Sequence, residues 1–134
     1  MAAIQIVPGR SMGGIVLGAD VNSLPSEARG IDKTHQVHGV HFTILDGKVD
    51  DVWIDDLRAL PDGAVVDGTA LPPNASLDEI KRILGPCESI EGVKGGVYFR
   101  CAKGLVLGTD WEGKGQFIQI RLRDRIGASV PYLK

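Results

Sequence analysis

Gly39-Val40-His41-Phe42, followed by Gly47 and Val49, is the stretch that indicates the fold, because the chain repeats it. The pattern recurs 57 positions later as Gly96-Val97-Tyr98-Phe99, followed by Gly104 and Val106. Five of the eleven paired positions from 39 to 49 are identical. A second echo pairs residues 19–24 with residues 75–80. Two related segments in the same order predict two copies of one supersecondary unit.

Each copy is expected to be a short helix followed by antiparallel strands. The clearest helix is predicted over residues 77–84, where apolar side chains recur on one face. Ser76 and Glu79 have the spacing of a capping box, and Gly85 followed by Pro86 ends the helix. In the first copy Asp20 is a plausible helix cap, but Pro25 limits the helix that follows. Asp46-Gly47 supplies the positive φ angles of a hairpin turn between strands.

The fold class follows from these elements. An amphipathic helix needs a surface to cover, and a sheet with one apolar face needs a cover. The sequence therefore predicts an α+β fold, a tandem repeat of short helix plus antiparallel β-strands, with the helices packed on one face of an antiparallel sheet. A length of 134 residues fits a single domain, 1–134, made of two related units at about 1–60 and 71–134. The proline-rich segment 71–74 is the expected linker between the two units.

Composition excludes some classes of partner. The net charge is −2, and no cluster of Lys and Arg forms the stripe that a phosphate backbone needs, so nucleic-acid binding is disfavoured. No apolar run reaches membrane-spanning length, so no membrane span is predicted. The first residues lack a basic leader with a long apolar core, which favours a cytoplasmic location. A periplasmic location is the alternative, if a leader has been removed.

The chain has two cysteines, Cys87 and Cys101, both in the second unit. The pair could form a disulfide that closes a short loop. In a reducing cytoplasm both would stay as thiols, and each could equally be a small buried apolar residue. The spacing alone leaves these alternatives open.

The three histidines lie within seven residues, at His35, His38 and His41. On a strand, His38 would face away from the other two, because successive side chains alternate between the faces. Three ligands therefore do not converge on one metal from this segment, and no metal site or other cofactor is predicted. A solvent-exposed strand face is the simpler interpretation.

Four aspartates, Asp50, Asp51, Asp55 and Asp56, surround Trp53. Paired carboxylates can perform acid–base chemistry, but no nucleophile or glycine-rich phosphate loop accompanies them. A solvated strand end is the plain interpretation. The third interpretation is a recognition patch, because acidic side chains around an aromatic ring can steer and anchor a basic partner.

Aromatic residues are few, and one or two of them on an open sheet face would serve as interface anchors. Combined with the acidic segment, they give a set of candidate partner-binding residues and no catalytic residue. The candidate set is Asp50, Asp51, Trp53, Asp55, Asp56, His41, Tyr98 and Trp111.

The segment 77–87, followed by a glycine-rich turn, a strand and Cys101, resembles one repeat of the β-lactamase inhibitory proteins. It also looks like the small outer-membrane-assembly lipoproteins of similar architecture. Residues 13–20 match the opening of the first unit. The resemblance implies a pairing of Cys87 with Cys101, because the inhibitory family joins a cysteine after the helix to one on the next strand. The chain departs from the pattern in its first half, which has no cysteine and a helix interrupted by Pro25, and in the lack of a secretion signal.

These observations predict a non-enzymatic protein-binding module. The leading hypothesis is an immunity or inhibitor protein, bacterial in character, that neutralises a toxin enzyme by occluding its active site. The alternative is an envelope- or assembly-associated binding module whose leader has been removed. In both cases the partner is another protein.

Overall fold

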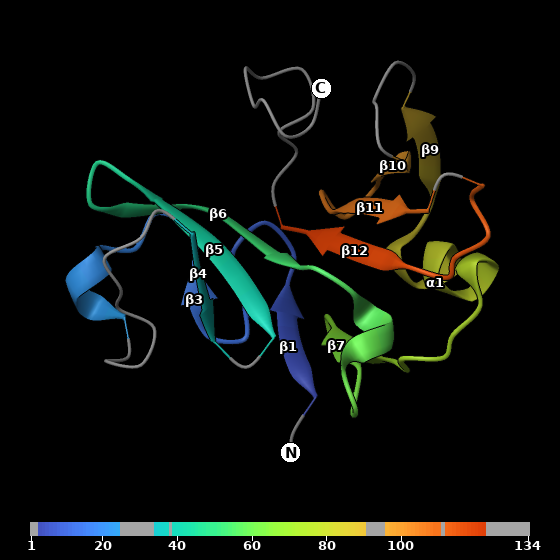
Figure 1. Ribbon diagram of the computed structural model, residues 1–134, viewed down its shortest axis with the longest axis horizontal. Coiled ribbons are helices and arrows are strands. Elements are labelled where there is room, and N and C mark those ends of the chain that lie inside the picture. Colours follow the sequence, from blue (N-terminus) through green and yellow to red (C-terminus); the bar gives the residue numbers. More distant parts are fainter. Residues whose placement is uncertain (1–2, 25–33, 38, 91–95, 111, 123–134) are drawn as a thin grey trace.

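The structure is a computed structural model that describes residues 3–24, 34–37, 39–90, 96–110 and 112–122; for 34–37 it describes the backbone alone. The described part of the chain contains twelve strands in two sheets and a single α-helix (Figure 1). The predicted α+β fold is therefore wrong, because the protein is mainly β.

The smaller sheet has five strands in the order β3-β2-β1-β7-β8. Its central strands, β1 and β7, run parallel, and the other pairs are antiparallel. The strands are β1 (Ile4–Val7), β2 (Ser11–Met12), β3 (Ile15–Val16), β7 (Ala64–Val66) and β8 (Thr69–Leu71). This sheet therefore joins the start of the chain to its middle.

The larger sheet is antiparallel, with seven strands in the order β4-β5-β6-β12-β11-β10-β9. Strand β12 lies between two three-stranded meanders that come from the two halves of the chain. The strands are β4 (Thr34–Val37), β5 (Val40–Leu45), β6 (Lys48–Ile54), β9 (Cys87–Ile90), β10 (Val97–Cys101), β11 (Val106–Thr109) and β12 (Ile118–Arg121). The repeated residues thus lie in equivalent hairpins, β5–β6 and β10–β11.

The helix α1 (Leu77–Leu84) has the predicted bounds. Ser76 caps it by accepting a hydrogen bond from the Glu79 N–H at 3.2 Å. The first half has only the three-residue 3-10 helix η1 (Val21–Ser23), capped by Asp20. A single turn cannot present an amphipathic face to a sheet, which is the physical reason that no pair of packed helices exists in the described residues. Figure 1 shows η1 and α1 at opposite ends of the molecule.

The apolar core lies between the two sheets. Ile6 and Met12 of the small sheet belong to the same buried cluster as Phe42 and Ile54 of the large sheet, and α1 contributes Ile80. Because β-strand side chains alternate, the residues between these core positions point to the opposite face of the large sheet. That outer face carries His41, Asp51, Trp53 and Tyr98, half of the eight candidate residues.

Candidate functional site

His41 and Trp53 are cross-strand partners on β5 and β6. Their rings are stacked, with centroids 5.6 Å apart and planes 17° from parallel. Trp53 is only 8% exposed, whereas His41 is half-buried. Trp53 thus stacks against the imidazole of His41, and the Trp53 side chain itself is largely buried.

The row continues onto β12, where Arg121 is the cross-strand partner of Trp53. The Arg121 guanidinium carbon lies 4.7 Å from the Trp53 ring centroid, a cation–π distance. Its Nη1 donates to Asp51 Oδ2 at 2.7 Å, and the two side chains are 4% and 1% exposed. A buried charge this close to its counter-ion has a structural role, so Asp51 is not at the solvated strand end that the sequence suggests.

Asp55 and Asp56 follow β6 and differ in what they do. Asp56 caps the 3-10 helix η3 (Leu57–Ala59), accepting from the Arg58 N–H at 3.0 Å and from the Ile118 N–H at 3.2 Å. Asp55 is exposed, and its Oδ1 accepts a long hydrogen bond of 3.4 Å from Gln119 Nε2. Asp55 therefore presents its carboxylate to solvent, while Asp56 holds the backbone around it.

These side chains meet in a cleft of about 380 Å³, which we call the acidic cleft. Its lining residues are Gly39, His41, Asp55, Asp56, Ala59 and Leu60. The cleft brings together three of the eight candidate residues, and it adds apolar surface from Ala59 and Leu60. Gly39 has a φ of +87°, and a Cβ there would lie 2.6 Å from Leu60 Cδ2, so a larger residue at position 39 would crowd the cleft.

The remaining candidates are not in the acidic cleft. Asp50 is half-buried on β6. Tyr98 is half-buried on β10, opposite Gly108 of β11, where a Cβ would come within 2.8 Å of the Tyr98 ring. Trp111 lies outside the described residues. Tyr98 thus covers a glycine on the sheet, and the structure does not join it to the acidic group.

The histidine cluster also divides. His41 lines the acidic cleft, His35 is on β4 with only its backbone described, and His38 lies outside the described residues. Within the described ranges, no group of three metal-ligating side chains comes together.

Arg58 holds the wall of the cleft in place, and the sequence does not single it out. Its guanidinium donates to the backbone carbonyls of Pro73 at 2.8 Å, Ala75 at 2.6 Å and Gly115 at 2.7 and 2.9 Å. A single Arg in η3 thereby joins three segments distant in sequence. The sequence does not predict this role of Arg58, because its hydrogen-bond partners are backbone carbonyls, which every residue has.

Asp110 organises the loop that Arg58 contacts. Its Oδ1 accepts hydrogen bonds from the Thr109 hydroxyl at 2.7 Å, the Gly115 N–H at 2.9 Å and the Gln116 N–H at 3.1 Å. Hydrogen bonds favour the charged carboxylate and lower the pKa of Asp110 to about 2; the Thr109 hydroxyl contributes most, followed by backbone N–H groups that include those of Lys114 and Gln116. The loop is therefore fixed by a carboxylate that stays ionised in all but strong acid.

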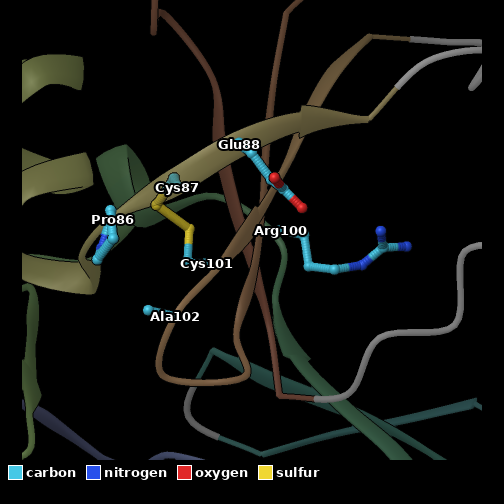
Figure 2. Close-up of a pocket in the computed structure, with 6 residues that line it drawn as sticks. All are labelled: Pro86, Cys87, Glu88, Arg100, Cys101 and Ala102. Carbon is cyan, nitrogen blue, oxygen red and sulfur yellow. A yellow bond between two sulfur atoms is a disulfide. The ribbon is translucent and has the colours of Figure 1, made fainter.

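Cys87 and Cys101 are bonded to one another across the β9–β10 pair (Figure 2). The disulfide lies in a surface cleft of about 340 Å³ lined by Pro86, Cys87, Glu88, Arg100, Cys101 and Ala102. Glu88 and Arg100 extend on one side of the disulfide, and Pro86 lies on the other (Figure 2). The pairing that the resemblance implies is thus present in the structure.

No known protein family, curated protein or solved structure shows a match to this chain. The resemblance to the β-lactamase inhibitory proteins and the assembly lipoproteins therefore stays a prediction. In the part of the chain that the structure describes, no helix has the length and apolar character needed to cross a membrane.

Proposed function

We propose that this chain is a non-enzymatic protein-binding module that occludes a functional site on its partner. The acidic cleft is the contact region, and it receives a Lys or Arg side chain of the partner. The observation that carries the proposal is the exposed carboxylate of Asp55 beside the half-buried imidazole of His41, in a cleft of about 380 Å³.

A long basic side chain fits this chemistry better than a small polar ligand. Lys and Arg carry an apolar stem and a charged head, so they can contact Ala59 and Leu60 while the charge meets Asp55. The ring of Trp53 stacks on that of His41 from the neighbouring strand, a contact that restricts the imidazole.

The same residues support binding over catalysis. Of the two carboxylates in the cleft, Asp56 is engaged by two backbone N–H groups. No serine, threonine or cysteine is among the residues that line the cleft, and both cysteines of the chain are bonded to one another. An acid–base mechanism would leave Asp55 and His41 without a nucleophile supplied by this cleft.

Two biological settings fit a module of this kind. The first is an immunity or inhibitor protein that neutralises a toxin enzyme by covering its active site. The second is an envelope- or assembly-associated binding module. The disulfide between Cys87 and Cys101 favours the second setting, because disulfides persist in the periplasm and outside the cell and are rare in the cytoplasm. We therefore propose an oxidising compartment, in contrast to the cytoplasmic location that the N-terminal residues favour.

The test is co-purification of the tagged protein with its partner, followed by binding measurements on the purified pair. Asp55→Lys reverses the exposed charge of the acidic cleft and should abolish capture. Asp78→Lys is the matched control, because it makes the same charge change at an exposed position of α1 outside the cleft. Equal binding of the partner by wild type and Asp55→Lys would exclude the acidic cleft as the contact region.

A further inference from the structure

A second cleft has the opposite charge. It has a volume of about 640 Å³ and is lined mainly by the last turn of α1 and the turn after β10. We call it the basic cleft. Its lining residues are Thr69, Lys81, Arg82, Ile83, Gly85, Pro86 and Lys103. Three of these residues are cationic, and none of the lining residues carries a carboxylate.

The cations are held at different points of the fold. The Lys81 ammonium lies 4.1 Å from the centroid of the Phe99 ring, a contact that fixes it without neutralising its charge. Lys103 lies 4.0 Å from Asp67 Oδ2, at the limit of an ion pair, and both side chains are partly exposed. Arg82 is exposed on the surface of α1. A pair as long and exposed as Lys103–Asp67 holds its partners weakly, so an incoming carboxylate can compete for Lys103.

The cations that line the cleft have negative neighbours that do not line it. The carboxyl end of a helix carries about half a negative charge, and Asp67 adds one more. Asp78 and Glu79 lie one turn before Lys81 and Arg82 on α1, so the positive charge is a property of the residues that line the cleft. The disulfide at the start of β9, next to Pro86, joins β9 to β10. It restrains the backbone beside the cleft that the three cations line.

We propose that the basic cleft is a second interaction surface, which binds an acidic segment of a partner protein. The three cations match carboxylates spaced along a peptide, Thr69 offers a hydroxyl, and Ile83 and Pro86 offer apolar contact. A nucleic acid is a poorer fit, because proteins that bind duplexes commonly neutralise about 6–10 phosphates, whereas this cleft supplies three cations. Together with the acidic cleft, it gives the molecule two surfaces of opposite charge.

The probe is a fluorescein-labelled, glutamate-rich peptide of about eight residues, which spans about 26 Å when extended. Its binding is followed by fluorescence anisotropy with the disulfide-bonded protein at about 50 mM salt, where electrostatic contacts are weakly screened. We expect saturable binding that weakens as salt rises. The variant Arg82→Glu/Lys103→Glu should weaken binding at least about tenfold, because two attractive contacts become repulsive.

The matched control is Arg10→Glu/Lys48→Glu, which makes the same charge change at two exposed positions that do not line the basic cleft. It should bind the peptide within about twofold of wild type after the change in net charge is allowed for. Circular dichroism and urea unfolding establish that both variants are folded.

Four results would overturn the proposal. The first is no saturable binding of the peptide, and the second is an equal loss of binding in the control variant. The third is tighter binding of single-stranded DNA than of the peptide, which would assign the cleft to nucleic acid. The fourth is self-association of the protein that is abolished by Asp55→Lys and also by Arg82→Glu/Lys103→Glu. That result would show that the basic cleft binds the acidic cleft of a second copy. Asp55→Lys should leave peptide binding unchanged, which separates this test from that of the acidic cleft.

Discussion

The buried pair of Asp51 and Arg121 tests whether Asp51 stabilises the fold, in contrast to Asp55, which we assign to partner binding. Arg121 Nη1 lies 2.7 Å from Asp51 Oδ2, and the side chains are 4% and 1% exposed. We predict that Asp51→Leu strongly destabilises the protein, because it leaves the Arg121 guanidinium buried without its counter-ion. Arg121→Met should be as harmful, because it leaves a buried carboxylate.

The magnitude follows from the geometry. Two unit charges about 4 Å apart interact by about 4 kcal/mol at an effective dielectric constant of about 20. Removal of one partner of a buried pair costs about 3–5 kcal/mol by comparison with other proteins. The double variant Asp51→Leu/Arg121→Met replaces the pair by apolar side chains, a change that is often near neutral. We therefore expect it to lose less stability than either single variant.

The assay is urea unfolding followed by tryptophan fluorescence, in which buried Trp53 reports on the surroundings of Arg121. The coupling energy of the double-mutant cycle should exceed about 2 kcal/mol. Additive losses in the double variant, or a loss below about 1 kcal/mol for Asp51→Leu, would refute the assignment of Asp51 to the structure.

Three further predictions concern the disulfide, Asp110 and Arg58, which stabilise the structure around the two clefts. Replacing Cys87 and Cys101 together by Ala should lower the free energy of unfolding by about 3 kcal/mol, the value for closing a loop of about 15 residues, as urea unfolding would measure; no loss would contradict the loop-closure argument. The pKa of Asp110 is lowered to about 2, so its contribution to stability is complete above the unfolded pKa of about 3.9 and is lost as pH falls through about 2. The stability difference between wild type and Asp110→Asn should therefore shrink from pH 5 to pH 2 in urea titrations, and a constant difference would count against the network. Arg58→Met should cost about 3 kcal/mol in urea unfolding, because buried carbonyls lose charged donors, whereas a loss below about 1 kcal/mol would show that Arg58 does not brace the cleft wall.

Local structure could be predicted from the sequence where a few neighbouring residues determine it. The helix over 77–84 has the predicted bounds, because Ser76 caps it and Gly85 with Pro86 prevents its continuation. The turn at Asp46-Gly47 joins β5 to β6 as predicted, with positive φ at both residues.

The fold class could not be predicted in this way, because it depends on pairings between distant strands. The parallel contact of β1 with β7 and the position of β12 between the two meanders bring together residues from the two halves of the chain. No local pattern encodes these contacts, and the weak alternation of strands as short as β2 and β3 hides the second sheet.

The sequence could not divide the candidate residues into structural and exposed ones, for a related reason. Asp51 and Asp55 are both aspartates next to apolar residues of one short segment, so the sequence does not distinguish them. Their difference comes from Arg121, which is 70 residues away from Asp51 in the chain. The boundary between the two predicted units stays a prediction.

The most direct test of the central claim is the dissociation constant of the captured partner for wild type, Asp55→Lys and Asp78→Lys. The account predicts that Asp55→Lys weakens binding at least about tenfold while Asp78→Lys leaves it within about twofold, because the contact charge lies in the acidic cleft. Reversal of the contacting Lys or Arg of the partner to Glu should then restore binding to Asp55→Lys. Equal dissociation constants for wild type and both variants would contradict the claim.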